Sequence, residues 1–194
     1  LPNGRRQLRP TREGHPVDLF DRFNRLANQV GGLLGDLADD ARPHVELAQA
    51  LLDRGDTDGA IAELKLALDK RRDHARALYL LGLAYSKRGR PGDSQEAKRA
   101  LEEALAVREG YSEAYLALGD ALSQGGEYEA AAENYRSALP LLPDGTARAE
   151  VEQRLGSLYL STGQLDKAVR ELRKAVSSDP DNGASQGLLG QALV

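Results

Sequence analysis

The sequence predicts an all-α solenoid in which short helical hairpins stack in chain order, and two observations support this prediction. The first is that residues 112–145 contain two apolar stripes with helical spacing on either side of the pair Gly125-Gly126. The stripes consist of Tyr115, Leu118 and Leu122, then Ala131, Tyr135 and Ala138. Because paired glycines break a helix, we expect two helices joined by a turn, with Pro143 ending the second helix.

The second observation is that this hairpin pattern recurs. The pair Leu118-Gly119 has counterparts at Leu47-Ala48, Leu81-Gly82, Leu155-Gly156 and Leu189-Gly190. The second stripe has counterparts at Ala60, Leu64 and Ala67, at Ala97, Leu101 and Ala104, and at Ala168, Leu172 and Ala175. The first and last intervals between pairs are 34 residues, and the two between them are 37. Since one hairpin cannot bury its own stripes, neighbouring hairpins are expected to cover each other, with small residues where helices cross.

In its length and its Leu-Gly-x-x-Tyr, Ala-x-x-x-Phe and Pro pattern, this unit resembles the tetratricopeptide repeat over residues 41–194. The resemblance implies a right-handed superhelical solenoid of hairpins at 41–74, 75–111, 112–145 and 149–182, with 183–194 starting a fifth repeat or forming a capping helix. The longer intervals place three extra residues near 90–93 and three near 146–148, and we expect both additions in connections. Asp93 and Glu96 resemble a capping box.

Two segments are predicted before the repeats. Residues 1–14 carry four arginines, a single acid and almost nothing apolar, which is typical of a disordered basic tail. Residues 15–40 are predicted to form an extra amphipathic helix, whose apolar seam runs through 17–37 at steps of three and four. We expect the seam to cap the first hairpin, and a homodimer through residues 17–37 is the alternative.

Composition narrows the classes of partner. A net charge of −4 argues against a nucleic-acid partner, which would favour a basic surface. No apolar run approaches the roughly 18–20 residues that cross a bilayer, and no signal-peptide core is present. The chain starts at Leu1 and contains no methionine, so we expect a fragment, and its preference for arginine over lysine suggests a bacterial source. The compartment stays open, with the cytoplasm favoured and an exported or membrane-anchored parent as the alternative.

The sequence offers no set of catalytic or metal-binding residues. It lacks the glycine-rich phosphate-binding motifs and the G-x-S-x-G nucleophile motif. His15, His44 and His74 have no histidine partner at helical spacing, and there is no cysteine. We therefore expect neither enzymatic activity nor a metal or other cofactor.

In the family that the repeat resembles, one face of each first helix lines a concave groove that binds extended or helical peptides. Carried over to this chain, that face forms the predicted groove: Arg42, Val45, Gln49, Arg76, Tyr79, Leu83, Lys87, Leu116, Asp120 and Gln153. Its middle is apolar, its basic residues lie toward one end, and the acids Glu113, Asp120 and Glu150 lie toward the other. The carboxylate clamp of some co-chaperone members is absent, because only Arg154 matches it.

These observations predict a non-catalytic protein–protein interaction module, an adaptor or scaffold that binds a partner protein or peptide in the predicted groove. Two alternatives stay open. The first is a structural scaffold that self-assembles through the N-terminal helix or the ends of the solenoid, and the second is a regulatory segment of a larger enzyme.

Overall fold

The computed structural model describes residues 40–194, and this part of the chain contains nine α-helices, one short 3-10 helix and no strand. The helices are α2 (Arg42–Asp53), α3 (Thr57–Lys70), α4 (Ala75–Arg88), α5 (Asp93–Val107), α6 (Ser112–Gln124), α7 (Tyr128–Ala138), η1 (Leu139–Leu141), α8 (Thr146–Ser161), α9 (Leu165–Ser178) and α10 (Gly183–Ala192). The predicted tail at 1–14, the predicted helix at 15–40 (Asp40 apart) and its seam at 17–37 lie outside the described residues.

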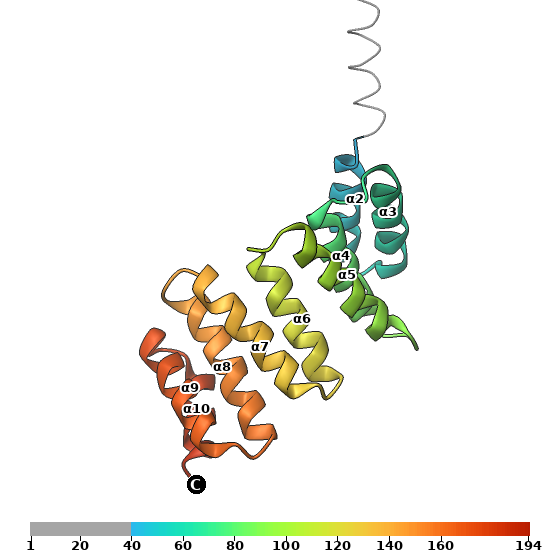
Figure 1. The fold of residues 1–194 in the computed structure, drawn as a ribbon. Helices are drawn as coiled ribbons and strands as arrows, with labels where there is room; N and C mark the ends of the chain where they lie inside the picture. Colours follow the sequence, from blue (N-terminus) through green and yellow to red (C-terminus); the bar gives the residue numbers. More distant parts are fainter. Residues whose placement is uncertain (1–39) are drawn as a thin grey trace, which may run out of the picture. The chain divides into compact units, whose positions relative to one another are not determined.

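Consecutive helices pack against each other along this part of the chain (Figure 1). The pairs α2–α3, α4–α5, α6–α7 and α8–α9 form four helical hairpins, and α10 packs against α9. Each hairpin contacts the next through α3–α4, α5–α6 and α7–α8. The prediction of an all-α helical-repeat solenoid is therefore confirmed.

A glycine with left-handed backbone closes the turn between the two helices of each hairpin. These residues are Gly55, Gly89, Gly126 and Gly163, with φ between 65° and 84°. A side chain with a Cβ atom is disfavoured in this conformation. Of the predicted pair Gly125-Gly126, only Gly126 adopts it, since Gly125 has a φ of −77°.

Small residues stand where the first helix of a hairpin crosses the second. A Cβ atom added at Gly82 would lie 2.5 Å from Cγ of Leu101, and one added at Gly119 would lie 2.5 Å from the ring of Tyr135. The first hairpin has Ala48 at this position, fully buried, so its crossing has room for a methyl group. The same position in α10 is Gly190, where an added Cβ atom would have nothing within 4 Å.

Two details of the sequence prediction are corrected at the third and fourth hairpins. Helix α7 ends at Ala138, well before Pro143, and continues as the 3-10 helix. Pro140 causes the change, because it has no N–H group to donate to the preceding turn. Residues 146–148 form the first turn of α8 instead of a connection, and Arg148 Nε lies 3.1 Å from Asp144 Oδ1 one turn earlier. No glycine or proline interrupts this turn, so the helix extends through it.

Asp93 does not form the predicted capping box. Its carboxylate, 5% exposed, accepts hydrogen bonds from Nε and Nη2 of Arg88 at 2.8 and 2.6 Å and from the backbone N–H of Arg90 at 2.9 Å. Nη1 of Arg88 also donates to Asp58 of α3 at 2.9 Å, so the cluster joins the first hairpin to the second. The Arg88 guanidinium holds the pKa of Asp93 at about 2.

The leucine that comes before the small residue of each first helix is buried only where another hairpin precedes that helix. Leu81 is 8% exposed in the interface between α3 and α4. Leu47, at the same repeat position, is 49% exposed. Among residues 40–194 no hairpin precedes α2, so nothing in the described part of the chain covers Leu47.

Candidate functional site

The residues of the predicted groove lie on the first helices of the four hairpins, and α4 contacts both α2 and α6. On α2, Arg42 is exposed, and Gln49 is half-buried and donates to Oδ1 of Asp53 at 3.0 Å. Val45 is only 2% exposed and belongs to the hydrophobic core. The assignment of Val45 to a binding surface is therefore corrected, because its side chain fills the space between helices.

The middle of the predicted groove lies on α4. Tyr79 and Leu83 are half-buried, and Arg76 and Lys87 are exposed near opposite ends of this helix. The Tyr79 ring packs against the ring of Tyr111, with centroids 5.1 Å apart. Tyr79 therefore supports the junction between the second and third hairpins and presents only part of its side chain to a partner.

Asp120 lies in a polar network rather than at an acidic end of the groove. Its Oδ1 accepts from the Tyr135 hydroxyl at 2.7 Å, and its Oδ2 accepts from Nη1 of Arg154 at 2.5 Å. Burial, reinforced by this hydrogen bond, raises the pKa of Tyr135, so the hydroxyl stays a donor. The network joins α6, α7 and α8. Arg154, the single match to a carboxylate clamp, is thus paired with Asp120.

Gln153 connects α8 to α10. Its Oε1 accepts from the hydroxyl of Ser185 at 2.9 Å, and Ser185 is fully buried. The N–H of Ser185 donates to Oδ1 of Asn182 at 3.1 Å, which caps the first turn of α10. Gln153 therefore positions α10.

Leu116 on α6 is the remaining residue of the predicted groove. Its side chain is half-buried and packs against the core between the third and fourth hairpins.

A hollow of about 370 Å³ opens between α8 and α10. Its lining residues are Ser157, Leu160, Ser161, Leu165, Leu188 and Gln191. The first three lie on α8, on the face that also carries Gln153, one helical turn or more toward the C-terminal end. This hollow gives the first-helix surface a concave site lined by three leucines and three polar side chains, on the same face of α8 as the predicted groove residue Gln153.

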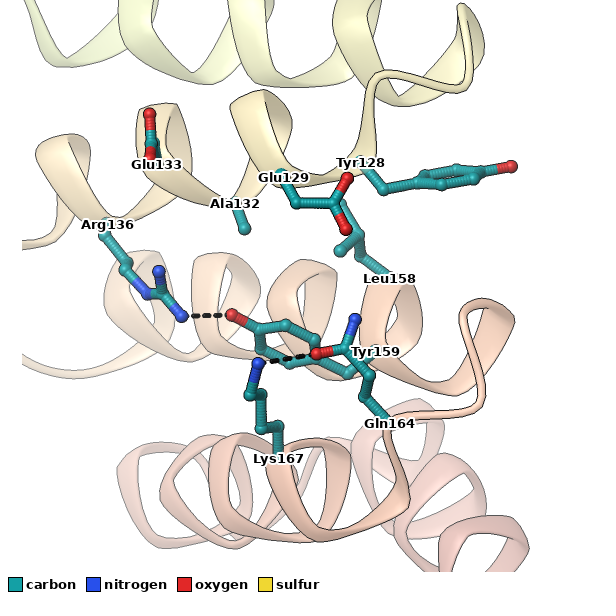
Figure 2. Close-up of a pocket in the computed structure, with 9 residues that line it drawn as sticks. All are labelled: Tyr128, Glu129, Ala132, Glu133, Arg136, Leu158, Tyr159, Gln164 and Lys167. Carbon is teal, nitrogen blue, oxygen red and sulfur yellow. Dashed lines mark hydrogen bonds between the residues drawn. The ribbon is translucent and has the colours of Figure 1, made fainter.

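A second hollow, of about 160 Å³, lies on the side of the second helices (Figure 2). Arg136 of α7 and Lys167 of α9 approach Tyr159 of α8 from the two flanking helices. Tyr159 is 3% exposed and accepts a hydrogen bond from Nη2 of Arg136. Sequence reasoning missed this site because Tyr159 occupies an ordinary core position of the repeat. The sequence signal that could have indicated it is the pair of cations Arg136, directly after Tyr135, and Lys167, directly before Ala168.

Membrane-spanning helices and metal sites are both absent from the described residues. None of the helices over residues 40–194 has both the length and the apolar character that a membrane span needs. Within the same residues, no group of three or more His, Asp or Glu is arranged to hold a metal ion.

The stacked hairpins, with small residues at their crossings and glycine turns, define a helical-repeat protein of the kind that serves in protein interactions. Residues 39–89 match a family described as TPR repeat, and residues 89–146 and 126–192 match two families described as tetratricopeptide repeat. The chain belongs to the tetratricopeptide repeat family, and the resemblance seen in the sequence is confirmed. No curated protein matches the sequence.

Solved structures of the same family have similar folds. MamA from Desulfovibrio magneticus RS-1, from residue 41 to its end, is 25% identical with a TM-score of 0.69, and the match covers 78% of this chain and 82% of that chain. TTC0263, a thermophilic TPR protein of Thermus thermophilus, is 23% identical with a TM-score of 0.64, covering 91% and 93%. YrrB, a TPR protein with an unusual peptide-binding site, is 22% identical with a TM-score of 0.68, covering 84% and 80%.

Proposed function

We propose that this protein binds a partner peptide or protein along the surface formed by its first helices, from α4 to the hollow between α8 and α10. The family places the chain among protein-interaction modules in general. The observation that supports this proposal most directly is the 370 Å³ hollow, where the leucines at 160, 165 and 188 line a partly exposed space together with Ser157, Ser161 and Gln191. Concave apolar sites with a few polar groups are where ligands bind most often.

The charges on this surface indicate the chemistry of the partner. Arg76 and Lys87 on α4 are exposed, and no ion pair is formed by either among residues 40–194. The negative charge at the predicted acidic end of the groove is reduced, because Arg154 forms an ion pair with Asp120. A peptide with acidic residues toward α4 and large apolar residues toward the hollow therefore fits this surface better than a basic one.

The test begins with a phage-displayed library of random dodecapeptides, panned against the full chain. A selected peptide is then synthesised with a fluorescent label, and its Kd is measured by anisotropy. We expect the selected peptides to be enriched in Asp or Glu together with Leu or aromatic residues. Reversing two charges with Arg76→Glu and Lys87→Glu should raise Kd at least tenfold, and Leu160→Ser should do the same at the apolar end.

The matched control reverses the same number of charges on a second helix, with Arg170→Glu and Arg173→Glu, both exposed on α9. This variant has the same net charge as the α4 variant, so it separates local contact from long-range attraction. We expect its Kd to stay within about twofold of the unaltered chain. The proposal fails if the α9 variant weakens binding as much as the α4 variant does.

A further inference from the structure

We infer that the hollow formed by α7, α8 and α9 is a second recognition site, which takes the carboxylate of an acidic side chain from a partner protein. This site is made by the second helices and Tyr159, so it does not depend on the surface of the first helices proposed above. Its residues come from two successive hairpins, and it therefore exists only when the third and fourth hairpins are packed together.

Two cations meet at one tyrosine in this hollow. Lys167 Nζ lies 5.4 Å from the centroid of the Tyr159 ring, and the Arg136 guanidinium carbon lies 5.8 Å from it. The Tyr159 hydroxyl accepts from Arg136, and Nζ of Lys167 donates to Oε1 of Gln164 at 2.6 Å. The buried ring and these hydrogen bonds hold the two charged groups in place before a ligand arrives (Figure 2).

No carboxylate of the described residues lies within ion-pair distance of either cation. Arg136 and Lys167 are both exposed, and neither forms an ion pair within residues 40–194. Glu129 and Glu133 also line the hollow, but Figure 2 shows Glu133 directed away from the Tyr159 hydroxyl and Glu129 directed toward Tyr128. A guanidinium and an ammonium that both lie near the Tyr159 ring supply charge-assisted donors of the kind that the two oxygens of a carboxylate accept.

Size favours a side chain over a larger ligand, and charge favours a carboxylate over a phosphate. The volume of about 160 Å³ is enough for an acidic side chain but lies below the range of about 300–1,000 Å³ that is typical of pockets for whole small-molecule ligands. The four charged lining groups, Arg136, Lys167, Glu129 and Glu133, sum to zero. A singly charged ligand next to the two cations therefore meets much less repulsion from the two glutamates than a dianion would.

The equivalent hollow between α3, α4 and α5 lacks this arrangement. There Tyr85 holds the place of Tyr159, while Lys65 and Glu96 hold those of Arg136 and Lys167. The cation over the Tyr85 ring is Arg88, which is already bound by Asp93 and Asp58. The groove therefore recurs in the described part of the chain, and of these two copies only the one at Tyr159 presents two cations that form no ion pair among the described residues.

The test is an NMR titration of the isotope-labelled full chain with three blocked peptides: acetyl-Ala-Glu-Leu-Ala-amide and its versions with glutamine or phosphoserine in place of the glutamate. We expect the glutamate peptide to shift the ring signals of Tyr159 and the amide signals around Arg136 and Lys167, with a Kd at least tenfold below that of the glutamine peptide. The Kd of the glutamate peptide should rise with salt, because the contact is electrostatic.

The double variant Arg136→Gln with Lys167→Gln should lose this binding at least tenfold, and Lys167→Gln alone should lose part of it. The matched control, Lys65→Gln with Arg99→Gln, changes the first copy of the groove and should bind as the unaltered chain does. Three results would overturn the inference: equal binding of the glutamate and glutamine peptides, an equal loss in the control variant, or shifts that leave Tyr159 and the amides around Arg136 and Lys167 unchanged. Tighter binding of the phosphoserine peptide would overturn the assignment to a carboxylate.

Discussion

The close contact between the two helices that cross at Gly82 predicts how much stability the protein loses when this glycine is replaced. Replacing Gly82 with alanine places a Cβ atom 2.5 Å from Cγ of Leu101, 2.9 Å from its Cδ2 and 3.2 Å from the carbonyl oxygen of Ala97. Non-bonded carbon atoms normally stay about 3.5–4.0 Å apart, so the closest contact is short by about 1 Å. Leu101 is fully buried and cannot move into solvent. Overpacking of this kind costs about 1–3 kcal/mol.

Gly190→Ala is the control that separates the cost of overpacking from the change in helix propensity. Both glycines stand at the same repeat position inside a helix, and alanine in place of glycine gains up to about 1 kcal/mol of helix propensity at each. An added Cβ atom at Gly190 has nothing within 4 Å, so only the gain remains there. The difference between the two substitutions should therefore be about 1–3 kcal/mol, with Gly82→Ala the less stable variant.

Thermal unfolding followed by circular dichroism measures this difference. For a chain of this size, each kcal/mol corresponds to about 2–4 °C in Tm. A double-mutant cycle with Leu101→Ala adds a sharper test, because removing the leucine side chain should relieve the clash and make the cycle strongly non-additive. Equal Tm changes for Gly82→Ala and Gly190→Ala, or an additive cycle, would show that the crossing is not tightly packed.

Two further predictions concern pH. Asp93→Asn should lower Tm at neutral pH, because Arg88 loses its charged acceptor. With the pKa of Asp93 held at about 2, below the ordinary value near 4, this stabilisation is present above about pH 4 and is lost as the pH falls through about 2. The Tm difference should shrink over that window, whereas Asp73→Asn, at an exposed pair, should change Tm little at any pH. Burial, and the nearby charge of Glu113, raise the pKa of Tyr111 to about 12. The neutral phenol therefore contributes its full stability below about pH 10, and this stability is lost as the pH rises through about 12. Tyr111→Phe should flatten the alkaline fall in Tm, and an unchanged fall would contradict this assignment.

Much of the fold follows from local pattern. Helical periodicity identifies the buried stripe of each helix, and glycine and proline mark the turns, because both effects act within a few residues of the chain. The recurrence of these signals in fixed phase was enough to predict the four hairpins and their family. Even so, the pattern did not show which of two prolines ends a helix. Pro140, the earlier one, ends α7, so Pro143 does not decide its length.

The binding surfaces depended on tertiary structure. The repeat pattern placed Val45 and Asp120 on a groove, but Val45 is buried and Asp120 is bound to Tyr135 and Arg154. Repeat position states which way a side chain points, whereas its burial and charge balance depend on residues in neighbouring helices, far away along the chain. The same holds for the pair of cations at Tyr159, which belong to different hairpins. Sequence by itself determined the units of this protein, and the packing between units decided which of their surfaces remain open to a partner.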